Sequence, residues 1–248
     1  MTRVESLGRV LFHIRSWSPV PVVLAVLALL AFAPGPAAPP SMELALLGLG
    51  LLACVVGQAL RAWVLGLVQA GTSGQNDYLE AVALNTAGPY SHVRNPLYVG
   101  NFLICLGLAL AAGNLWAALL GLGFFAFEYA FIVPAEEGFL RERFGGAYDA
   151  YCAAVPRWLW QFTPAPSTTQ TLSTTFDWRR ALKKEHNPFC AWSSGMLVLL
   201  GLHAWLQHGS EALPTLTLLA VAELALLLAY VGVKGWKRRW WLAGNPQA

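Results

Sequence analysis

Residues 88–100 read GPYSHVRNPLYVG, a polar turn that leads straight into a long apolar segment. A second polar run, EEGFLRERFGGAYDAYCAAVPRW at 136–158, begins where the next apolar segment ends. One apolar hairpin separates the two runs, so we expect the hairpin to bring them together at one membrane face. Because binding and catalytic residues gather on loops, this arrangement favours a membrane enzyme over a channel or an anchor.

The composition predicts an all-α, polytopic membrane protein. Apolar residues occupy 56% of the 248 positions and charged residues only 12%, with a mean hydropathy of +0.51. Soluble domains carry about 25% charged residues. A helix needs roughly 20 apolar residues to cross the bilayer core. Six segments approach or reach that length, so we expect about six transmembrane helices, at 18–34, 43–68, 96–113, 115–134, 191–208 and 212–233.

The first 17 residues form a pattern of their own. Arg3, Arg9 and Arg15 lie off a stripe of apolar residues at helical spacing, which are Val4, Leu7, Val10, Leu11, Ile14 and Trp17. A basic stretch before an apolar segment is also typical of a cleaved signal peptide, but the proline-rich run at 31–40 is no clean cleavage site. We therefore expect residues 1–17 to form an amphipathic helix at the membrane interface.

The positive charges predict the orientation. With both termini in the cytoplasm, 15 of the 16 lysines and arginines lie on the cytoplasmic side, and the sixteenth, Arg61, lies within the second span. The outer connections carry none, so the positive-inside rule selects this topology. The net charge of +3 then reflects orientation and indicates no nucleic-acid partner. Four cysteines without a CxxC or Cys/His pairing indicate neither a disulfide framework nor a bound metal.

The chain divides at residues 163–175, TPAPSTTQTLSTT, a stretch without apolar period or charge that is typical of a linker. It separates a four-span core with a cytoplasmic pocket, 18–162, from a C-terminal extension, 176–248. The extension consists of a basic run at 178–188, which suits anionic headgroups, and a two-span hairpin. We expect the extension to act mainly as an anchor; the alternative is a role in shaping the substrate portal.

Three charged residues lie inside the predicted spans, namely Arg61, Glu128 and Glu223. Burying an ion in lipid costs at least roughly 2.5–3.5 kcal/mol, so each needs a partner or a wet cavity. Glu128 lies about two turns before Glu136 on one helical segment, which favours a place at the end of a pocket over an ion pair with Arg61. Glu223 lies far from both motifs, and we expect it to hydrogen-bond a neighbouring helix.

The two polar runs carry more chemistry than a loop or a cap requires. In the first, Pro96 suits the first position of a helix, and five polar or ring side chains suggest ligand recognition: Tyr90, His92, Arg94, Asn95 and Tyr98. In the second, an apolar stripe predicts an interfacial helix that caps the bundle, with Leu140, Phe144, Tyr148, Tyr151 and Val155 at spacings of three and four. The carboxylates of Glu136 and Glu137 suit the positive helix end, a ribose diol or a cationic group.

At these two runs the sequence resembles a known family. The order G-x-Y-x-x-x-R-[HN]-P-x-Y-x-G, an apolar hairpin, an EE pair and L-x-x-x-F-G-x-x-Y-x-x-Y-x-x-x-V-P-R is similar to integral membrane methyltransferases related to isoprenylcysteine carboxyl methyltransferase and phospholipid N-methyltransferases. The resemblance covers about residues 43–160. It implies S-adenosyl-L-methionine as the cofactor, entering from the cytosol, and a lipophilic, membrane-embedded acceptor, either a lipid or a lipidated carboxylate or amine.

The resemblance also implies roles for individual residues. Cofactor contacts fall on the loop and on both motifs, at Gln75, Val82, Leu84, Asn85, Tyr90, Asn95, Pro96, Leu97, Tyr98 and Glu136. Arg94 and Glu137 support them, and Tyr148, Tyr151 and Arg157 close the cytoplasmic side around the substrate. A carboxylate acceptor needs no base, whereas an amine or a hydroxyl does, and Glu137 and Glu128 are the candidates. Holding nucleophile, methyl carbon and sulfur in line supplies roughly 7–11 kcal/mol.

Two positions depart from the family pattern. Asn95 stands where the family usually has histidine; it donates and accepts hydrogen bonds but carries no proton, so acid–base chemistry at that position is excluded. Ile132 lies one turn before Glu136, where the prenylcysteine enzymes resemble one another in having an arginine for the substrate. A prenylcysteine carboxylate would lack that partner, so the pattern supports the methyl donor better than this acceptor.

Two other functions compete with methyl transfer. Some membrane sterol reductases resemble this architecture and bind NADPH, but a pair of carboxylates is a poor host for a phosphorylated dinucleotide. A transporter or a membrane scaffold predicts polar groups spread through the spans, whereas the three charged residues there form no continuous path. Methyl transfer therefore remains the leading hypothesis, with an ester, an ether or a methylated amine as the product.

Overall fold

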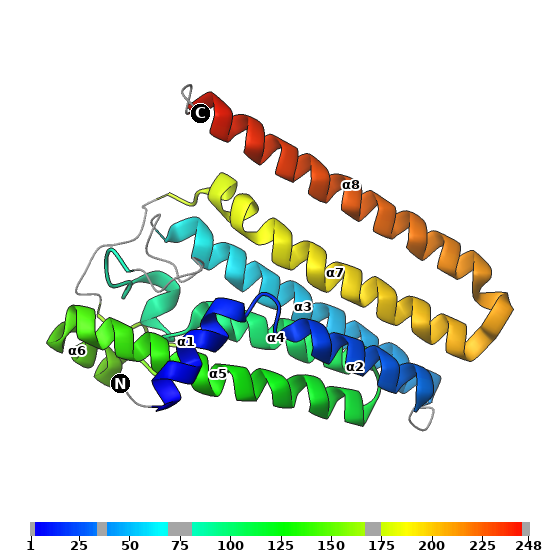
Figure 1. Cartoon of the computed structure of the whole chain (residues 1–248), viewed down its shortest axis with the longest axis horizontal. Coiled ribbons are helices and arrows are strands. Elements are labelled where there is room, and N and C mark those ends of the chain that lie inside the picture. Colours follow the sequence, from blue (N-terminus) through cyan, green and yellow to red (C-terminus); the bar gives the residue numbers. More distant parts are fainter. Residues whose placement is uncertain (1–2, 34–38, 69–80, 167–174, 245–248) are drawn as a thin grey trace.

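The computed structural model describes residues 3–33, 39–68, 81–166 and 175–244, and this part of the chain folds into helices without a strand. The expected all-α class is confirmed. The long helices lie alongside one another, and α1 and α6 lie toward one end of the bundle, on the left in Figure 1. The elements are α1 (Arg3–Ile14), α2 (Pro19–Phe32), α3 (Pro40–Leu67), the 3-10 turn η1 (Gly88–Ser91), α4 (Pro96–Ala111), α5 (Leu115–Phe144), α6 (Gly146–Ala154), α7 (Trp178–His208), the 3-10 turn η2 (Gly209–Ala212) and α8 (Leu213–Gly244).

The expected count of six spans is not confirmed. Within the described residues, three helical stretches are long and apolar enough to cross a membrane, Ser41–Leu67, Leu115–Phe144 and Trp178–Lys237, and α1 with α2 makes a fourth only if a pair bent by 69° counts as one. The stretch Trp178–Lys237 folds back on itself at η2 as the hairpin of α7 and α8 (Figure 1). At 1.5 Å per residue, α2 and α4 measure only about 21 and 24 Å, short of the roughly 30 Å hydrocarbon core.

The outward surface of the bundle is apolar. Large aliphatic side chains are exposed along the long helices, among them Leu44, Leu52, Leu119, Leu218 and Leu228. The most apolar window of the α7–α8 stretch has none of its residues buried. Such a surface matches lipid, and polar backbone groups inside the helices are satisfied internally. The protein is therefore an integral membrane protein.

The amphipathic helix expected at 1–17 corresponds to α1. One face of α1 packs on α5, where Phe12 is buried and Gly8 lies so close that a Cβ there would clash with the carbonyl of Phe131. The opposite side leaves apolar residues exposed, at Leu7, Val10, Ile14 and Trp17. An apolar face that the protein does not cover is the arrangement of a helix in the membrane interface.

Helices α3 and α4 pack through paired glycines. Gly57 faces Gly100, and Gly50 faces Gly107, so the two backbones approach closely. A Cβ at Gly57 would lie 2.6 Å from the carbonyl oxygen of Gly100, and backbone cannot move aside as a flexible side chain does. Small residues at helix contacts are the usual basis of tight packing in membranes. This contact sets the position of α4, and with it the polar run that precedes α4.

We expect Gly57→Ala to destabilise the protein by about 1–3 kcal/mol, because the added methyl group overpacks the contact between α3 and α4. Gly48→Ala, on the same helix, is the matched control: a Cβ there meets nothing within 4 Å, so this change is expected to be neutral or to stabilise by about 0.5–1 kcal/mol. Thermal unfolding in detergent checks both. Equal melting temperatures for the two variants would contradict the packing argument.

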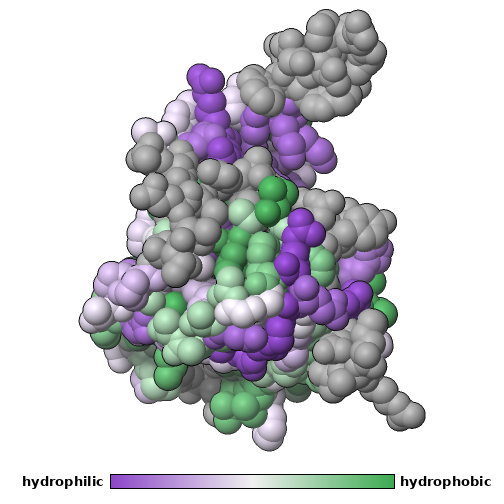
Figure 2. All heavy atoms as spheres, turned by 90° about the vertical axis from the view of Figure 1, so that its left-hand side faces the viewer, coloured by the Kyte–Doolittle hydropathy of each residue, from purple (hydrophilic) through white to green (hydrophobic). Residues whose placement is uncertain are grey.

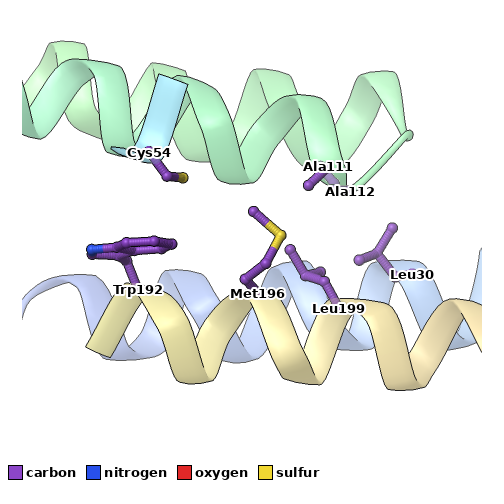
Figure 3. Packing of buried hydrophobic residues seen from close by; sticks show 8 residues of the cluster. Leu30, Cys54, Ala111, Ala112, Trp192, Met196 and Leu199 are labelled. Atoms are coloured by element: carbon purple, nitrogen blue, oxygen red, sulfur yellow. The ribbon is translucent and has the colours of Figure 1, made fainter. Parts of the chain in front are cut away.

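The C-terminal extension is part of the core. Trp192, Met196 and Leu199 point from α7 toward α3 and the end of α4 (Figure 3). They belong to one buried cluster, which comprises Leu30, Cys54, Ala111, Ala112, Ala117, Trp192, Met196 and Leu199. Glu223 on α8 accepts a hydrogen bond of 2.8 Å from the Ser194 hydroxyl on α7, which confirms the expectation that it bonds a neighbouring helix. The expected linker at 163–175 lies mostly outside the described residues, which omit 167–174.

The helix expected after Glu136-Glu137 is broken in two. Gly145 takes a positive φ of 53°, which ends α5 and lets α6 turn away. The predicted apolar stripe is nevertheless correct, because its residues form a second buried cluster with Leu84 from the loop before η1. That cluster contains Leu84, Tyr148, Tyr151 and Val155, flanked by Leu140 and Phe144. Helix α6 thus caps the end of the bundle.

Candidate functional site

A cavity of about 490 Å³ lies at the capped end of the bundle, where the two polar runs meet. Figure 2 views this end: hydrophilic side chains cover its upper part, near the ends of α7 and α8, and a strip of hydrophobic residues below is bordered by further hydrophilic ones. Twelve residues expected in the site line the cavity. They are Leu84, Asn85, Tyr90, Arg94, Asn95, Pro96, Leu97, Tyr98, Glu136, Glu137, Tyr148 and Tyr151.

The turn before α4 is fastened to the segment that follows α6. It begins at Gly88, whose φ of 57° reverses the chain, and ends at Asn95, directly before α4. Three backbone hydrogen bonds join the two segments, from Arg94 N to Pro156 O at 2.9 Å, from Gln161 N to His92 O at 3.0 Å and from Ala165 N to Ser91 O at 3.0 Å. The two motifs are therefore parts of one structure, as the hairpin argument predicts.

His92 supports this junction and does not line the cavity. Its ring nitrogen Nδ1 lies 2.7 Å from the carbonyl oxygen of Gln161, and its ring stacks on Trp160 at 4.8 Å between centroids. The expectation that His92 takes part in ligand recognition therefore has no support in the geometry. A histidine in a polar turn can either stabilise the turn or bind a ligand. Only its contacts in the folded protein distinguish these two roles.

Glu137 joins the two motifs through two guanidinium groups. Its buried carboxylate accepts a hydrogen bond of 3.0 Å from Nε of Arg157 and lies 3.4 Å from NH1 of Arg94. Asn95 completes the junction, since its Nδ2 donates to the carbonyl of Arg157 at 3.1 Å. Contacts between a carboxylate and guanidinium groups are charge-assisted and stronger than hydrogen bonds between neutral groups. We call this group of Glu137, Arg94, Arg157 and Asn95 the carboxylate clasp.

Glu136 lines the cavity beside Tyr98. The Tyr98 hydroxyl donates a hydrogen bond of 2.8 Å to one Glu136 oxygen. Tyr98 in turn packs on Tyr129, 4.6 Å away between ring centroids, and Asn101 Nδ2 donates to the Tyr129 hydroxyl at 2.7 Å. Aromatic packing and these hydrogen bonds hold Glu136 in one orientation, with its second oxygen available to a ligand.

The tyrosines at the capped end present neutral hydroxyl groups. Burial raises the pKa of Tyr90, of Tyr148 and of Tyr151 well above the ordinary range for a phenol. The Tyr151 hydroxyl donates to the carbonyl of Tyr90 at 2.8 Å, which ties α6 to the turn before α4. These side chains therefore remain protonated at physiological pH and offer hydrogen bonds without charge.

Of the four other residues expected in the site, three are placed elsewhere and the fourth cannot be compared. Gln75 lies outside the described residues. Val82 is 71% exposed and does not line the cavity. Glu128 faces the bend between α1 and α2, where it accepts a hydrogen bond from Ser18, and Arg157 stands behind Glu137 in the carboxylate clasp. The periodicity of an apolar helix does not show which neighbour a polar side chain will meet.

Arg61, the alternative partner expected for Glu128, forms its ion pair with another residue. Arg61 pairs with Glu185 on α7, through two hydrogen bonds of 2.9 and 2.7 Å, and both side chains are buried. Ile132, which replaces the family arginine, is fully buried and does not line the cavity. The described residues contain no group of three or more His, Cys, Asp or Glu side chains that could hold a metal ion.

Sequence reasoning missed the contribution of the C-terminal extension to the cavity. The extension provides Lys183, Lys184, Asn187, Pro188 and Lys237 to its wall. The expectation that it acts mainly as an anchor is therefore wrong in this respect. One signal in the sequence could have indicated this contact. Glu185 is an acidic residue within a basic stretch, and Arg61, inside a predicted span, needed an acidic partner. The bend after α1 adds Arg15 and Ser16 to the opposite rim.

Comparisons with known proteins agree with this geometry. Residues 46–147 match the model of the phospholipid methyltransferase family. A protein-S-isoprenylcysteine O-methyltransferase of Schizosaccharomyces pombe is 36% identical over 110 residues, which cover 41% of this chain and 44% of that protein. A nickel-cobalt-cadmium resistance protein of Alcaligenes xylosoxydans xylosoxydans is 28% identical over 176 residues, 71% of this chain and 75% of that protein. No solved structure matches the chain.

The matched segment contains the turn before α4, α4 itself and the glutamate pair of α5, and residues within this segment form most of the cavity wall. The family match thus falls on residues that the structure brings together. Over this segment the chain is therefore similar to membrane methyltransferases.

Proposed function

We propose that this protein transfers a methyl group from S-adenosyl-L-methionine to a lipophilic acceptor in the membrane, at the cytoplasmic face. The observation that carries the proposal is that both family motifs line a single cavity. Its volume of about 490 Å³ lies within the range of roughly 300–1,000 Å³ that is usual for sites of small molecules and cofactors. A cofactor from the cytosol and an acceptor from the bilayer can meet at such a position.

The donor set of the cavity fits this cofactor. When bound, S-adenosyl-L-methionine supplies an activated methyl group on a positively charged sulfur. The carboxylates of Glu136 and Glu137 complement positive charge, and the free oxygen of Glu136 also suits a ribose diol. We assign cofactor contacts to the residues of the implied set that line the cavity, which are Leu84, Asn85, Tyr90, Asn95, Pro96, Leu97, Tyr98 and Glu136. Gln75 and Val82 have no such support.

The carboxylate clasp favours positioning over proton transfer. Of the two candidate bases, Glu137 lines the cavity and Glu128 does not. Both oxygens of Glu137 are already engaged by Arg157 and Arg94, which leaves them poorly placed to contact an acceptor. An acceptor that needs no base, such as a carboxylate, suits this site better than an amine or a hydroxyl. Tyr148 and Tyr151 then close the cytoplasmic side as neutral walls.

The orientation and the division of the chain are part of the proposal. The start of α7 and the end of α8 lie toward the same end of the molecule as α6 (Figure 1), and residues from α7, from α8 and from the bend after α1 line the cavity. The clustering of lysines and arginines at this end supports its cytoplasmic location, with both termini on that side. We propose that the chain divides into segments 1–17, 18–162, 163–175 and 176–248, and that residues from more than one segment form the cavity.

Calorimetric titration of the detergent-purified protein with S-adenosylhomocysteine tests the cofactor assignment. We expect Glu136→Gln to weaken binding about tenfold, because it removes a charge-assisted contact of roughly 1.5 kcal/mol. Glu142→Gln is the matched control: Glu142 lies on the same helix, is 70% exposed and is outside the cavity. A folded protein that binds NADPH but no S-adenosylhomocysteine would overturn the proposal in favour of a reductase.

A further inference from the structure

The C-terminal extension meets the cavity through a buried polar network that begins outside the segment matched by the family. Glu185 on α7 binds Arg61, and Gln58 Nε2 donates to the same carboxylate at 2.7 Å. Trp192 Nε1 donates to Gln58 at 2.9 Å, and Arg61 also donates to Asn101 on α4. These contacts hold the first turns of α7 against α3 and α4, so the cavity-facing residues of α7 have a fixed place.

The end of α8 is held at the same level as the start of α7. Trp178 stacks on Trp236 at 6.5 Å between centroids, and His186 stacks on Tyr230 at 5.5 Å. The ammonium group of Lys183 also lies 5.5 Å from the centre of the Trp236 ring. This arrangement brings Lys183 and Lys184 of α7 and Lys237 of α8 to one wall of the cavity. We call these three residues the lysine wall.

The charged lining residues differ between the two sides of the cavity. Helix α5 provides both carboxylates, one of them beside Arg94, and Arg15 also lines the cavity, whereas α7 and α8 provide three lysines and no carboxylate. The carboxylates among the lining residues are Glu136 and Glu137, both on α5, and both already have partners in the core. Arg61 is neutralised by Glu185. The lysine wall therefore leaves the side formed by α7 and α8 with a positive field, in a cleft whose low-dielectric surroundings strengthen that field.

We propose that the lysine wall binds the anionic group, a carboxylate or a phosphate, of the amphiphilic acceptor whose methylation is proposed above. The inference rests on the proposed function, because it names the class of acceptor for the same cavity. The acidic side on α5 then takes the positive cofactor, and the basic side on α7 and α8 takes the anion. Opposite charges at the two sides orient both molecules in the cavity. An apolar chain extends from the anion toward the exposed aliphatic surface of the helices.

Binding of simple amphiphiles to the full-length protein tests this proposal. The protein is immobilised in a neutral maltoside detergent and incubated with radiolabelled dodecyl phosphate, dodecanoate or uncharged dodecanol, at a fixed ratio of probe to detergent. We expect the double variant Lys184→Gln/Lys237→Gln to bind the anionic probes about tenfold more weakly, with the binding of dodecanol unchanged. Whichever anionic probe binds the unmodified protein more tightly identifies the group that the wall prefers.

The matched control is Arg179→Gln/Lys234→Gln. It removes two positive charges from the same two helices, about one turn away, at residues that do not line the cavity. Equal weakening by both double variants would mean general attraction to a basic surface and would overturn the proposal, as would binding of the anionic probes that neither variant changes. S-adenosylhomocysteine binding is measured on the same samples. Its absence, together with lysine-dependent binding of the anions, would refute the methyltransferase proposal while retaining the anion site.

Discussion

Replacing Glu185 by glutamine is expected to destabilise the protein by about 3–5 kcal/mol, the largest effect that we predict. Glu185 and Arg61 have side chains only 6% and 7% exposed. Removing one partner of a buried ion pair leaves the other charge without compensation in a medium of low dielectric constant. The single amide oxygen of glutamine cannot replace both carboxylate oxygens, which accept from Gln58 and from two nitrogens of Arg61, so the network that seats α7 on the core is weakened. Thermal unfolding in detergent, followed by loss of helical circular dichroism, measures the change.

An exposed ion pair of the same protein provides the control. Arg141 and Asp149 form a hydrogen bond of 2.7 Å, but their side chains are 52% and 56% exposed. Replacing Asp149 by asparagine should cost less than about 1 kcal/mol, because water compensates both charges. Similar melting temperatures for the Asp149 and Glu185 variants would show that α7 is not held by the buried pair. The double variant Arg61→Met/Glu185→Met should recover much of the loss, since it leaves no buried charge.

The second large effect is expected for Glu137→Gln, which opens the carboxylate clasp. The change leaves Arg94 and Arg157 without their shared anion, and the turn before α4 then has a weaker connection to the segment after α6. Loss of a buried, charge-assisted contact costs about 2–3 kcal/mol, so the affinity for S-adenosylhomocysteine should fall roughly 30- to 150-fold. Calorimetric titration under the conditions used for Glu136→Gln gives the comparison.

A second measurement separates positioning by Glu137 from direct contact with the cofactor. If the clasp acts by holding the turn, Arg157→Ala should reduce affinity as Glu137→Gln does, although Arg157 does not line the cavity. Glu142→Gln again provides a neutral reference on the same helix. Undiminished affinity in both clasp variants would contradict the role assigned to the junction.

Several features of this protein follow from local sequence pattern. The apolar periods predict the helices, because burial of a helix in lipid depends on its own composition and length. The stripe from Leu140 to Val155 predicts the cluster that caps the bundle, and a single hairpin between the two polar runs predicts that they meet. The glutamate pair and the turn before α4 line one cavity, because the hairpin of α4 and α5 returns the chain to the same end of the bundle.

Other features depend on contacts between distant segments. Arg61 and Glu185 are 124 residues apart in the chain, and no local period links them. Glu128 and His92 have the residue types of a functional site, yet Ser18 and Trp160 engage them elsewhere. Helices α2 and α4 are shorter than the apolar segments suggest. Capping residues and turns determine where each helix begins and ends.

The sequence by itself determined a helical membrane protein with the two motifs of a membrane methyltransferase, because apolar period and motif order are properties of a continuous chain. Only the tertiary structure decided that the C-terminal extension forms a wall of the cavity, that Glu137 is held in the carboxylate clasp and that three lysines line the same cavity as the glutamate pair. The physical reason is that the role of a charged side chain depends on the groups that surround it. Here those groups come from helices that only folding brings together.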